Sequence, residues 1–347
     1  MKSLLAFTLG VNHPSSRLRI AAYADHFLRR DWHLQMYHFD SGMGKSLPRA
    51  GSWWTRATRR LRRGWLTARA AAALRRLEPD EPIVISRALP VSRQPFLKAP
   101  NPMVLDIDDA LYLGPGRNRL LELCQRAQVV VCGNHTIAGE LSPFSRRCVV
   151  IPTVVDTDRF RVRTDHRLNG PLRVGWLGSS MSLEQTLLPW LDMLGEIRRQ
   201  VSFALVVISD EPPNFLRDIG WARYLPWSPA VEKSIADHMD VGLMPLQDAP
   251  YQAAKCGAKL VQYMAAGLPV IATPVGVNRD LVVDGVTGCW ATDANDWRQA
   301  IHRLAEQETL RAAFGQAGRK HVVQNYSIAR WADQWVDLLN ELGRQPD

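Results

Sequence analysis

Short runs of apolar and β-branched residues recur along the chain, and the stretches between them repeat apolar positions every three or four residues. The runs are typical of buried strands and the longer repeats of helices, so their alternation predicts a parallel α/β fold. The predicted strands are Leu4–Leu9, Leu34–Phe39, Ile83–Ser86, Met103–Ile107, Val129–Cys132, Val149–Ile151, Leu172–Leu177, Phe203–Ile208, Val241–Met244 and Val270–Ala272. The polar, charge-rich segment Pro152–Pro171 interrupts this alternation, which is typical of a linker between domains.

The length of 347 residues is enough for about two domains. The pattern favours an α/β fold with two doubly wound, Rossmann-like domains facing each other across a cleft, with ligands at the carboxyl ends of the strands. We expect the first domain over residues 1–160 and the second over 161–325. Residues 326–347 follow as an amphipathic helix whose apolar positions let it cross back to the first domain.

Composition narrows the class of protein. A hydrophobic content of 46% is ordinary for a globular chain, and no apolar run approaches the roughly 20 residues of a membrane span. The apolar start resembles a signal peptide, but Asn12–Pro14 cuts it short and no small-residue cleavage site follows. The five cysteines show no CxxC spacing, which predicts reduced thiols in a cytoplasm and no zinc site.

The net charge of +9 is concentrated in one segment. Residues 41–77 carry ten Lys or Arg and no acidic residue, so the rest of the chain sums to about −1. Within residues 52–77, one helical stripe is apolar and the opposite side is basic. The predicted stripe is Trp54, Ala57, Leu61, Trp65, Ala68 and Ala72, and the basic side is Arg56, Arg59, Arg60 and Arg63.

Three interpretations of this amphipathic segment remain open. The apolar stripe packs on the domain's own sheet and leaves a solvated basic face, or the helix lies on an anionic membrane surface, where Trp and Arg both suit the interface. The third interpretation is nucleic-acid binding through phosphate contacts, and it is the weakest because no nucleic-acid-binding motif is present. We therefore expect no nucleic-acid partner.

The turn after the strand Leu172–Leu177 is a candidate phosphate site. Gly178, Ser179 and Ser180 form the turn, and Ser182–Gln185 matches a capping box at the start of a helix. Free backbone N–H groups at such a helix start bind phosphate well. The alternative is that this is the ordinary turn of any αβ unit.

Two lysines stand near the start of a second predicted helix, over about Lys255–Ala266. A cation at a helix N-terminus costs about 0.3–1 kcal/mol, so Lys255 and Lys259 need an explanation. With Gln262 they share one helix face, and Gly257 between them lets a ligand approach the backbone. A bound anion explains this arrangement, and two solvated surface lysines are the alternative.

The stretch KLVQYMAAGLPVIATPVGVNRDLVVDGVTG, residues 259–288, resembles the signature of the large retaining GT-B glycosyltransferase group called family 4. VGWLGSS (174–180) is similar to that family's first strand and phosphate turn in the second domain. PTVVDTDRF (152–160) and PSSRLR (14–19) resemble its inter-domain segment and a first-domain loop. The resemblance implies a first domain that binds the acceptor and a second that binds a nucleotide-sugar. It implies a donor site formed by Gly178, Ser179, Ser180, Leu225, Lys255, Cys256, Gly257, Lys259 and Gln262.

The sequence departs from the family at charged positions. The two family glutamates fall on Ala254 and Gln262, and of these only Gln262 can still hydrogen-bond a ribose. The family's usual Arg and Lys after the first strand of the second domain are also absent. Lys255 and Lys259 would then supply the charge that meets the diphosphate.

The segment VLDIDDALY, residues 104–112, places three aspartates at the end of a predicted strand. Aligned on the family, Asp108 falls where many members carry a histidine, which makes it the catalytic candidate; helix capping by Asp108 or Asp109 is the alternative. A metal-binding DxD is the other interpretation, but GT-B enzymes generally neutralise the diphosphate with protein cations, so we expect no metal cofactor. Arg17, Arg19 and Arg87 are candidates to bind an anionic acceptor.

The resemblance implies a retaining glycosyltransferase that moves a sugar from a nucleotide-sugar donor to a saccharide or lipid-linked saccharide, in polysaccharide or glycan assembly. A cytoplasmic location, peripheral at the membrane, would suit such an acceptor. The alternatives are a nucleotide-sugar epimerase or hydrolase of the same fold, and a non-catalytic anion- or nucleic-acid-binding protein.

Overall fold

The computed structural model describes residues 1–40, 53–87 and 91–343, with the side chains of residues 40, 53–57, 59 and 217 excepted. The chain divides into two compact units, the first formed by Met1–Thr153 with Trp331–Asp347 and the second by Val154–Arg330. Each unit is built on one six-stranded parallel sheet. The predicted α/β class with two Rossmann-like sheets is confirmed.

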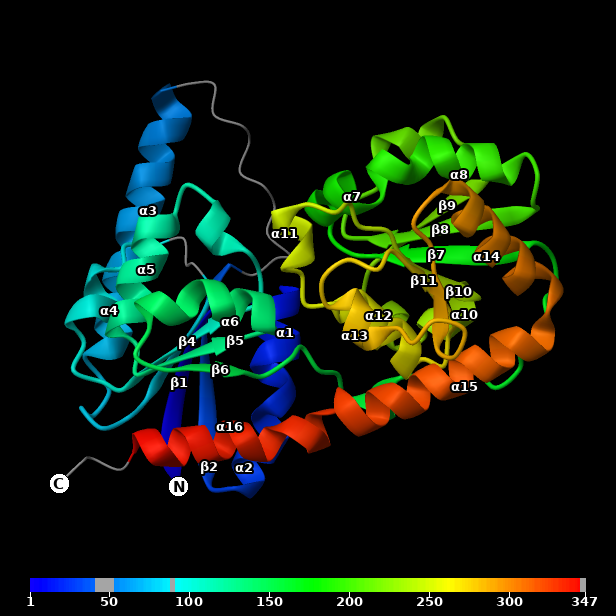
Figure 1. Cartoon of the computed structure of the whole chain (residues 1–347). Coiled ribbons are helices and arrows are strands. Elements are labelled where there is room, and N and C mark those ends of the chain that lie inside the picture. The colour runs from blue at the N-terminus through cyan, green and yellow to red at the C-terminus, as the bar shows by residue number, and fades with distance from the viewer. Residues whose placement is uncertain (41–52, 88–90, 344–347) are drawn as a thin grey trace. The chain divides into compact units, whose positions relative to one another are not determined.

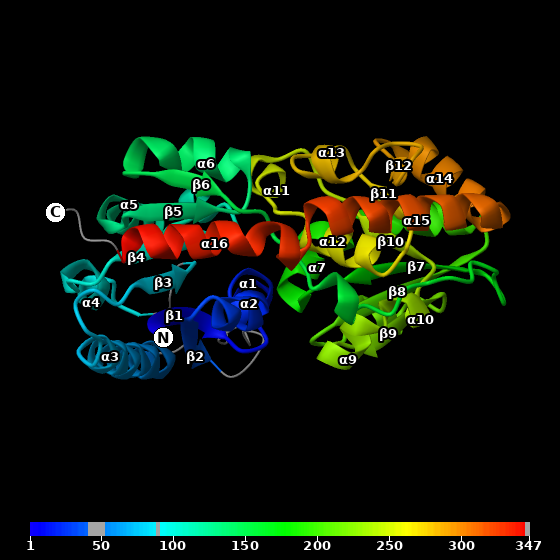
Figure 2. The ribbon, with the colours of Figure 1, turned by 90° about the horizontal axis from the view of Figure 1, so that it is seen from below.

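The first unit has the strand order β2-β1-β3-β4-β5-β6, which Figure 2 shows from one edge of the sheet to the other. Its strands are β1 (Lys2–Gly10), β2 (Trp32–Asp40), β3 (Ile83–Ser86), β4 (Met103–Ile107), β5 (Val129–Cys132) and β6 (Cys148–Val150). Its helices are α1 (Pro14–Arg19), α2 (Ala24–Arg29), α3 (Trp53–Leu74), α4 (Gln94–Lys98), α5 (Arg117–Arg126), α6 (His135–Leu141) and most of α16 (Ile328–Leu342). The strand order reverses between β1 and β3, which is where doubly wound sheets bind ligands.

The second unit has the order β12-β11-β10-β7-β8-β9, with its own reversal between β10 and β7 (Figure 2). Its strands are β7 (Leu172–Leu177), β8 (Phe203–Ser209), β9 (Ala222–Pro226), β10 (Val241–Met244), β11 (Val270–Ala272) and β12 (Gly288–Trp290). Its helices are α7 (Ser180–Thr186), α8 (Leu191–Arg198), α9 (Pro229–Lys233), α10 (Ile235–His238), α11 (Pro250–Ala253), α12 (Ala258–Ala265), α13 (Asn278–Leu281), α14 (Ala294–Glu306) and α15 (Glu308–Asn325).

All ten strands that the hydrophobic pattern predicts are present, six with the predicted bounds and four with ends shifted by one or two residues. The pattern missed β9 and β12, which lie at the two edges of the second sheet. An edge strand is buried on fewer sides, and β9 is half-exposed along its length while β12 is only three residues long. Neither therefore needs the continuous apolar run that marks a central parallel strand.

Helix α16 packs within the first unit, beside α2 (Figure 1). Trp335 is buried against Tyr23 and Phe27, with ring centroids 6.1 and 6.5 Å away. His26 on α2 meets Asp333 at 3.1 Å, and the indole of Trp32 donates to Asn340. The apolar stripe seen in the sequence thus covers one flank of the first sheet.

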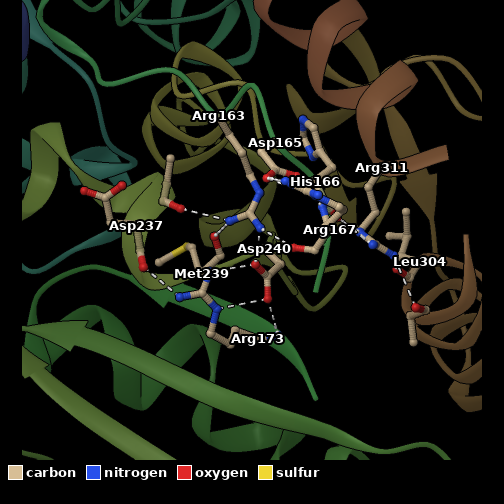
Figure 3. Close-up of polar contacts among 12 residues, drawn as sticks. Arg163, Asp165, His166, Arg167, Arg173, Asp237, Met239, Asp240, Leu304 and Arg311 are labelled. Atoms are coloured by element: carbon tan, nitrogen blue, oxygen red, sulfur yellow. Dashed lines mark hydrogen bonds and ion pairs between the residues drawn. The ribbon is translucent and has the colours of Figure 1, made fainter. Parts of the chain in front are cut away.

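The segment that enters the second unit is anchored at the amino ends of its strands (Figure 3). Asp240, just before β10, is 2% exposed and accepts from the backbone N–H and the guanidinium of Arg173 on β7. Arg163 pairs with the same carboxylate at 2.8 Å. Arg311 on α15, itself 3% exposed, donates to the carbonyl of His166 at 2.6 Å. These contacts tie the chain after residue 160 to β7, β10 and α15.

Candidate active site

Two of the predicted donor residues, Gly178 and Lys259, meet at the carboxyl end of β7, next to the reversal in strand order. The Nζ of Lys259 donates to the hydroxyl of Ser182 at 3.1 Å and lies 4.9 Å from the centre of the Trp176 ring. A Cβ on Gly178 would stand 2.8 Å from the Lys259 stem and 2.6 Å from Trp176. A side chain at position 178 would therefore displace the end of Lys259 and the ring of Trp176.

The start of α7 differs from the predicted capping box. Ser179 is the N-cap, and its hydroxyl accepts from the backbone N–H of Ser182, so the helix begins at Ser180 and not at Ser182. The backbone N–H of Ser180 donates to the carboxylate of Asp210 at 2.6 Å. The carboxylate of Asp210 already accepts a hydrogen bond at the start of α7. This turn is therefore a weaker anion-binding site than the sequence predicts. The positive charge beside it comes from Lys259.

The predicted helix over Lys255–Ala266 begins three residues later than expected. Gly257 adopts a left-handed φ of 65° as the N-cap of α12, and Lys255 lies before it in the turn after α11. Lys255, Lys259 and Gln262 therefore do not form one exposed helix face, and Gln262 is 5% exposed. The ammonium of Lys255 lies 4.7 Å from the ring centre of Tyr251.

The remaining predicted donor residues are separated along the sheet. Cys256 is partly buried in the same turn as Lys255 and is not part of a disulfide. Leu225 lies near the end of β9, where it pairs with Ile208, so it is two strands away from β7. The structure thus brings Gly178 and Lys259 together with Ser182, and places Leu225 farther along the carboxyl edge.

The first unit also gathers polar side chains at its reversal in strand order, between β1 and β3. Arg87 follows β3 and adopts a left-handed φ of 63°, a strained backbone for a residue other than glycine. Its guanidinium meets Asp108 at 3.4 Å, Asp109 at 3.1 Å and the hydroxyl of Ser15 at 3.3 Å. His13 caps α1 by accepting from the N–H of Ser15 through Nδ1. We refer to these five residues as the Arg87 cluster.

The charges of the Arg87 cluster follow from burial and from neighbouring groups. Burial raises the pKa of Asp108, but Arg87, Arg19 and the hydroxyl of Ser15 outweigh it, so the net pKa lies below its ordinary value. Asp108 is therefore ionised at neutral pH. Burial, followed by the nearby Arg87, lowers the pKa of His13 to about 4. A neutral His13 whose Nδ1 accepts a hydrogen bond carries its proton on Nε2, where it is a donor.

The capping interpretation of the aspartates is wrong for the turn that follows β4. The short 3-10 helix Leu111–Leu113 has Ala110 as its N-cap and no side-chain cap hydrogen bond. Asp109 accepts from the backbone N–H of Ala110, while Asp108 is directed to Arg87. No group of three His, Cys, Asp or Glu residues in a metal-binding arrangement is present among the described residues.

Arg19 is not available to an acceptor, contrary to its predicted role. It is 2% exposed, and its guanidinium meets the buried carboxylate of Asp106 at 2.5 Å and donates to the carbonyl of Ile151 at 2.8 Å. Arg19 on α1 is thus joined to Asp106 on β4 and to Ile151 after β6. Its role is therefore structural. Arg17 is partly exposed and donates to the carbonyl of Asn12.

Helix α3 presents a different face to its unit from the one predicted. Leu66, Ala70 and Leu74 are buried, whereas Leu61 is 75% and Trp65 57% exposed. Inward packing of the predicted stripe is therefore wrong for Leu61 and Trp65. The side chains of Trp54, Arg56, Ala57 and Arg59 lie outside the described residues. Within the described residues no helix is both long and apolar enough to cross a membrane.

Sequence reasoning missed three polar members of these clusters: His13, Ser15 and Asp210. Each follows a strand, and the rule that ligands lie at carboxyl ends of parallel strands could have found them. Asp210 directly follows β8, and His13 and Ser15 lie just after β1. Ser15 also lies in PSSRLR (14–19), the segment that resembles a first-domain loop of the family.

Comparisons with known proteins point to one family. The family model described as glycosyl transferases group 1 matches residues 172–307. A trehalose synthase from Pyrococcus horikoshii is 30% identical over 87 residues, which are 25% of this chain and 21% of that enzyme. The matched part is thus about a fifth of that relative's length.

Solved structures resemble the chain over nearly its whole length. A sucrose-phosphate synthase from Thermosynechococcus elongatus has a TM-score of 0.74 at 14% identity, covering 99% of both chains. The Anabaena protein HepE, in complex with UDP and glucose, has a TM-score of 0.70 at 14% identity, covering 98% of this chain and 100% of its own. A glycosyltransferase from Rickettsia africae has a TM-score of 0.72 at 12% identity, covering 99% of both chains.

At these identities the solved structures establish the fold, and the family model establishes the relationship of the second unit. The Gly178–Ser182 turn and Lys259 both lie inside the matched segment. Residues 172–307 of the second unit therefore match the group 1 glycosyltransferases, and the chain has the GT-B fold of its structural neighbours.

Proposed function

We propose that the protein transfers a sugar from a nucleotide-sugar to a saccharide or lipid-linked saccharide acceptor, with retention at the anomeric carbon. The observation that carries this proposal is the Lys259–Ser182–Gly178 contact at the strand reversal of the second unit, inside the segment matched by the family model. A lysine held against the turn after β7 is the arrangement that a diphosphate needs. The match of residues 172–307 to the group 1 glycosyltransferase model supports the same reaction.

The second unit would bind the donor. Lys259 would donate to the diphosphate, with Lys255 from the preceding turn as a second cation and Gln262 as a hydrogen-bonding partner of the ribose. Asp210 at the start of α7 would disfavour phosphate on that helix, which leaves Lys259 as the main electrostatic contact. Uridine diphosphate sugars are the first candidates to test, because a structural relative was solved with UDP and glucose.

The first unit would act on the acceptor. The ionised carboxylate of Asp108 would orient an acceptor hydroxyl and stabilise positive charge that develops on the sugar. Arg87 and Arg17 would bind an anionic part of the acceptor, while neutral His13 would donate through Nε2. In the transfer, the acceptor oxygen bonds to the anomeric carbon as the bond from that carbon to the phosphate oxygen breaks. The hydroxyl proton passes to the leaving phosphate.

A panel of nucleotide diphosphates and nucleotide-sugars in a thermal-shift assay tests the donor assignment. We expect one nucleotide diphosphate to raise the melting temperature, and product analysis with acceptors then distinguishes transfer from epimerisation or hydrolysis. No shift with any nucleotide diphosphate would contradict the enzyme assignment. Salt-sensitive binding to generic DNA would favour a nucleic-acid-binding protein instead.

A second proposal concerns location: α3 would rest on the anionic inner face of a membrane. Its exposed Leu61 and Trp65 stand among arginines in a segment without acidic residues. Apolar side chains that enter the headgroup region, with flanking arginines near anionic lipid, are typical of interfacial helices. We expect L61S/W65S to reduce co-sedimentation with anionic vesicles and to leave the melting temperature unchanged. Leu28→Ser, at the 55% exposed Leu28 of α2, is the matched control; equal binding by all three proteins would refute this proposal.

A further inference from the structure

A cavity of 290 Å³ lies in the first unit between α3, α4 and α5. Its inner lining is apolar: Ile85 comes from β3, Phe96 from α4 and Leu120 from α5, and each is at most 1% exposed. The volume is close to the lower end of pockets that bind small organic ligands, about 300 Å³. The Arg87 cluster does not contribute to this lining, although Ile85 and Arg87 belong to the same strand and the turn after it.

Three arginines line the same cavity: Arg63 on α3, Arg93 before α4 and Arg119 on α5. Arg93 is neutralised by Glu122, which accepts from its guanidinium at 2.7 Å. Arg63 and Arg119 are exposed, and among the described residues neither guanidinium has a hydrogen-bond or ion-pair partner. Two arginines from different helices thus bring unneutralised charge to one apolar cavity.

An apolar lining with two available guanidiniums suits a ligand that is apolar at one end and anionic at the other. Arginine binds phosphate through paired N–H donors, and the apolar lining excludes a fully hydrated ion. A free phosphate would leave Ile85, Phe96 and Leu120 facing water. A neutral hydrocarbon would leave the two cations without a partner.

We propose that this cavity binds a lipid phosphate, with the phosphate on Arg63 and Arg119 and the first carbons of the chain against Ile85, Phe96 and Leu120. The assignment rests on the proposed function, because it gives the acceptor its chemical class: a sugar acceptor carried on a lipid phosphate. The exposed Leu61 and Trp65 of α3 lie within one helical turn of Arg63, where such an acceptor would leave a lipid surface.

Isothermal titration of the full chain with decyl phosphate, below its micelle concentration and without donor, tests this assignment. Inorganic phosphate and decanol are the comparison ligands. We expect decyl phosphate to bind more tightly than either, and R63Q/R119Q to weaken its binding about tenfold or more. The control is R75Q/R76Q, which removes the same charge from exposed positions just after α3 and outside the cavity lining, and it should bind as the wild type does.

Three results would overturn the proposal. The first is equal loss of affinity in the two double variants, which would indicate only a general effect of net charge. The second is inorganic phosphate binding as tightly as decyl phosphate, which would exclude a role for the apolar lining. In the third, R63Q/R119Q loses binding to phosphatidylglycerol vesicles but retains wild-type affinity for decyl phosphate, which would assign the arginines to membrane lipid. The nucleotide thermal shift is independent of all three, so a failure here is distinguishable from failure of the donor assignment.

Discussion

Arginine–aspartate clusters occupy opposite ends of the two sheets. In the second unit, Asp240 stands before β10 at the amino ends of the strands and joins Arg163 and Arg173 (Figure 3). In the first unit, Arg87 meets Asp108 and Asp109 after β3 and β4, at the carboxyl ends. The residue types are the same in both clusters. Parallel sheets bind ligands at the carboxyl ends of their strands, which is where the cluster of the first unit lies.

The two clusters also differ in how their charges are used. Asp240 accepts from the backbone N–H of Arg173 as well as from its guanidinium, and Arg163 donates to the carbonyl of Ala236. The side chains of this cluster are therefore held by hydrogen bonds to the backbone. The Arg87 cluster instead includes a strained backbone and a histidine whose pKa is lowered to about 4. Unusual backbone and shifted pKa values are typical of functional sites. The comparison indicates that arginine–aspartate pairing alone does not identify a site.

The largest expected effect follows from removing Asp240. Asp240→Ala leaves Arg163 and Arg173 without their carboxylate, and breaking a buried pair in this way costs about 3 kcal/mol of folding free energy. Urea unfolding measures this loss, and nucleotide affinity of the folded fraction should stay unchanged. Asp165→Asn is the control because the Asp165–Arg167 pair is exposed and should not shift the transition. An unfolding midpoint for D240A equal to that of the wild type would show that Asp240 does not stabilise the fold.

In the Arg87 cluster the corresponding change should affect turnover and not stability. Asp108→Asn keeps the shape of the side chain but removes its charge, and we expect about a hundredfold lower turnover with little change in donor affinity. Steady-state kinetics and melting temperature are measured together. If D108N lowers the melting temperature as strongly as D240A does, the two clusters have the same role. Rescue of an EDTA-inactivated enzyme by manganese would instead establish a metal at the aspartates.

A third test concerns Lys259 in the donor site proposed for the second unit. Lys259→Ala removes a charge-assisted hydrogen bond, so nucleotide diphosphate binding should weaken about tenfold while binding of the bare nucleoside stays nearly constant. Lys255→Ala should have a similar or smaller effect, because Lys255 precedes α12 and lies over Tyr251. The exposed Lys233 on α9 provides the control, Lys233→Ala. Unchanged diphosphate affinity in both K255A and K259A would show that Lys255 and Lys259 are ordinary surface lysines that do not bind the diphosphate.

The smallest effect concerns pH. The folded-state pKa of His13 is about 4, below its ordinary 6.5, so the unfolded chain binds a proton more readily between these values. Stability should therefore fall as pH falls from about 6.5 to about 4, by at most about 1.4 kcal/mol per pH unit from this group. His13→Asn retains an N-cap for α1 and should show a shallower fall. Parallel slopes for H13N and the wild type would show that His13 is not held neutral.

The local hydrophobic pattern was enough to predict the central strands of both sheets. Central strands such as β4 and β7 are buried on both faces, so each requires a continuous apolar run that is visible in the sequence. The turns that contain Asp108 and Gly178 were located for the same reason, and the family resemblance then singled out Asp108 as the catalytic candidate. Within each sheet, the strand order then places the residues that follow neighbouring strands near one another.

Which of those polar residues are buried, and which side of a helix is covered, depends on contacts between residues far apart in the sequence. From the sequence, Arg19 is expected in an exposed loop. In the structure it is buried and donates a hydrogen bond to Asp106, which lies 87 positions away in the sequence. The sequence predicted that Leu61 and Trp65 lie on the buried side of α3. In the structure Leu66, Ala70 and Leu74 are buried instead. A helical period specifies an apolar stripe without specifying what packs on it. The start of α12 depended likewise on Gly257, whose left-handed φ comes with the close packing of Leu281 against it.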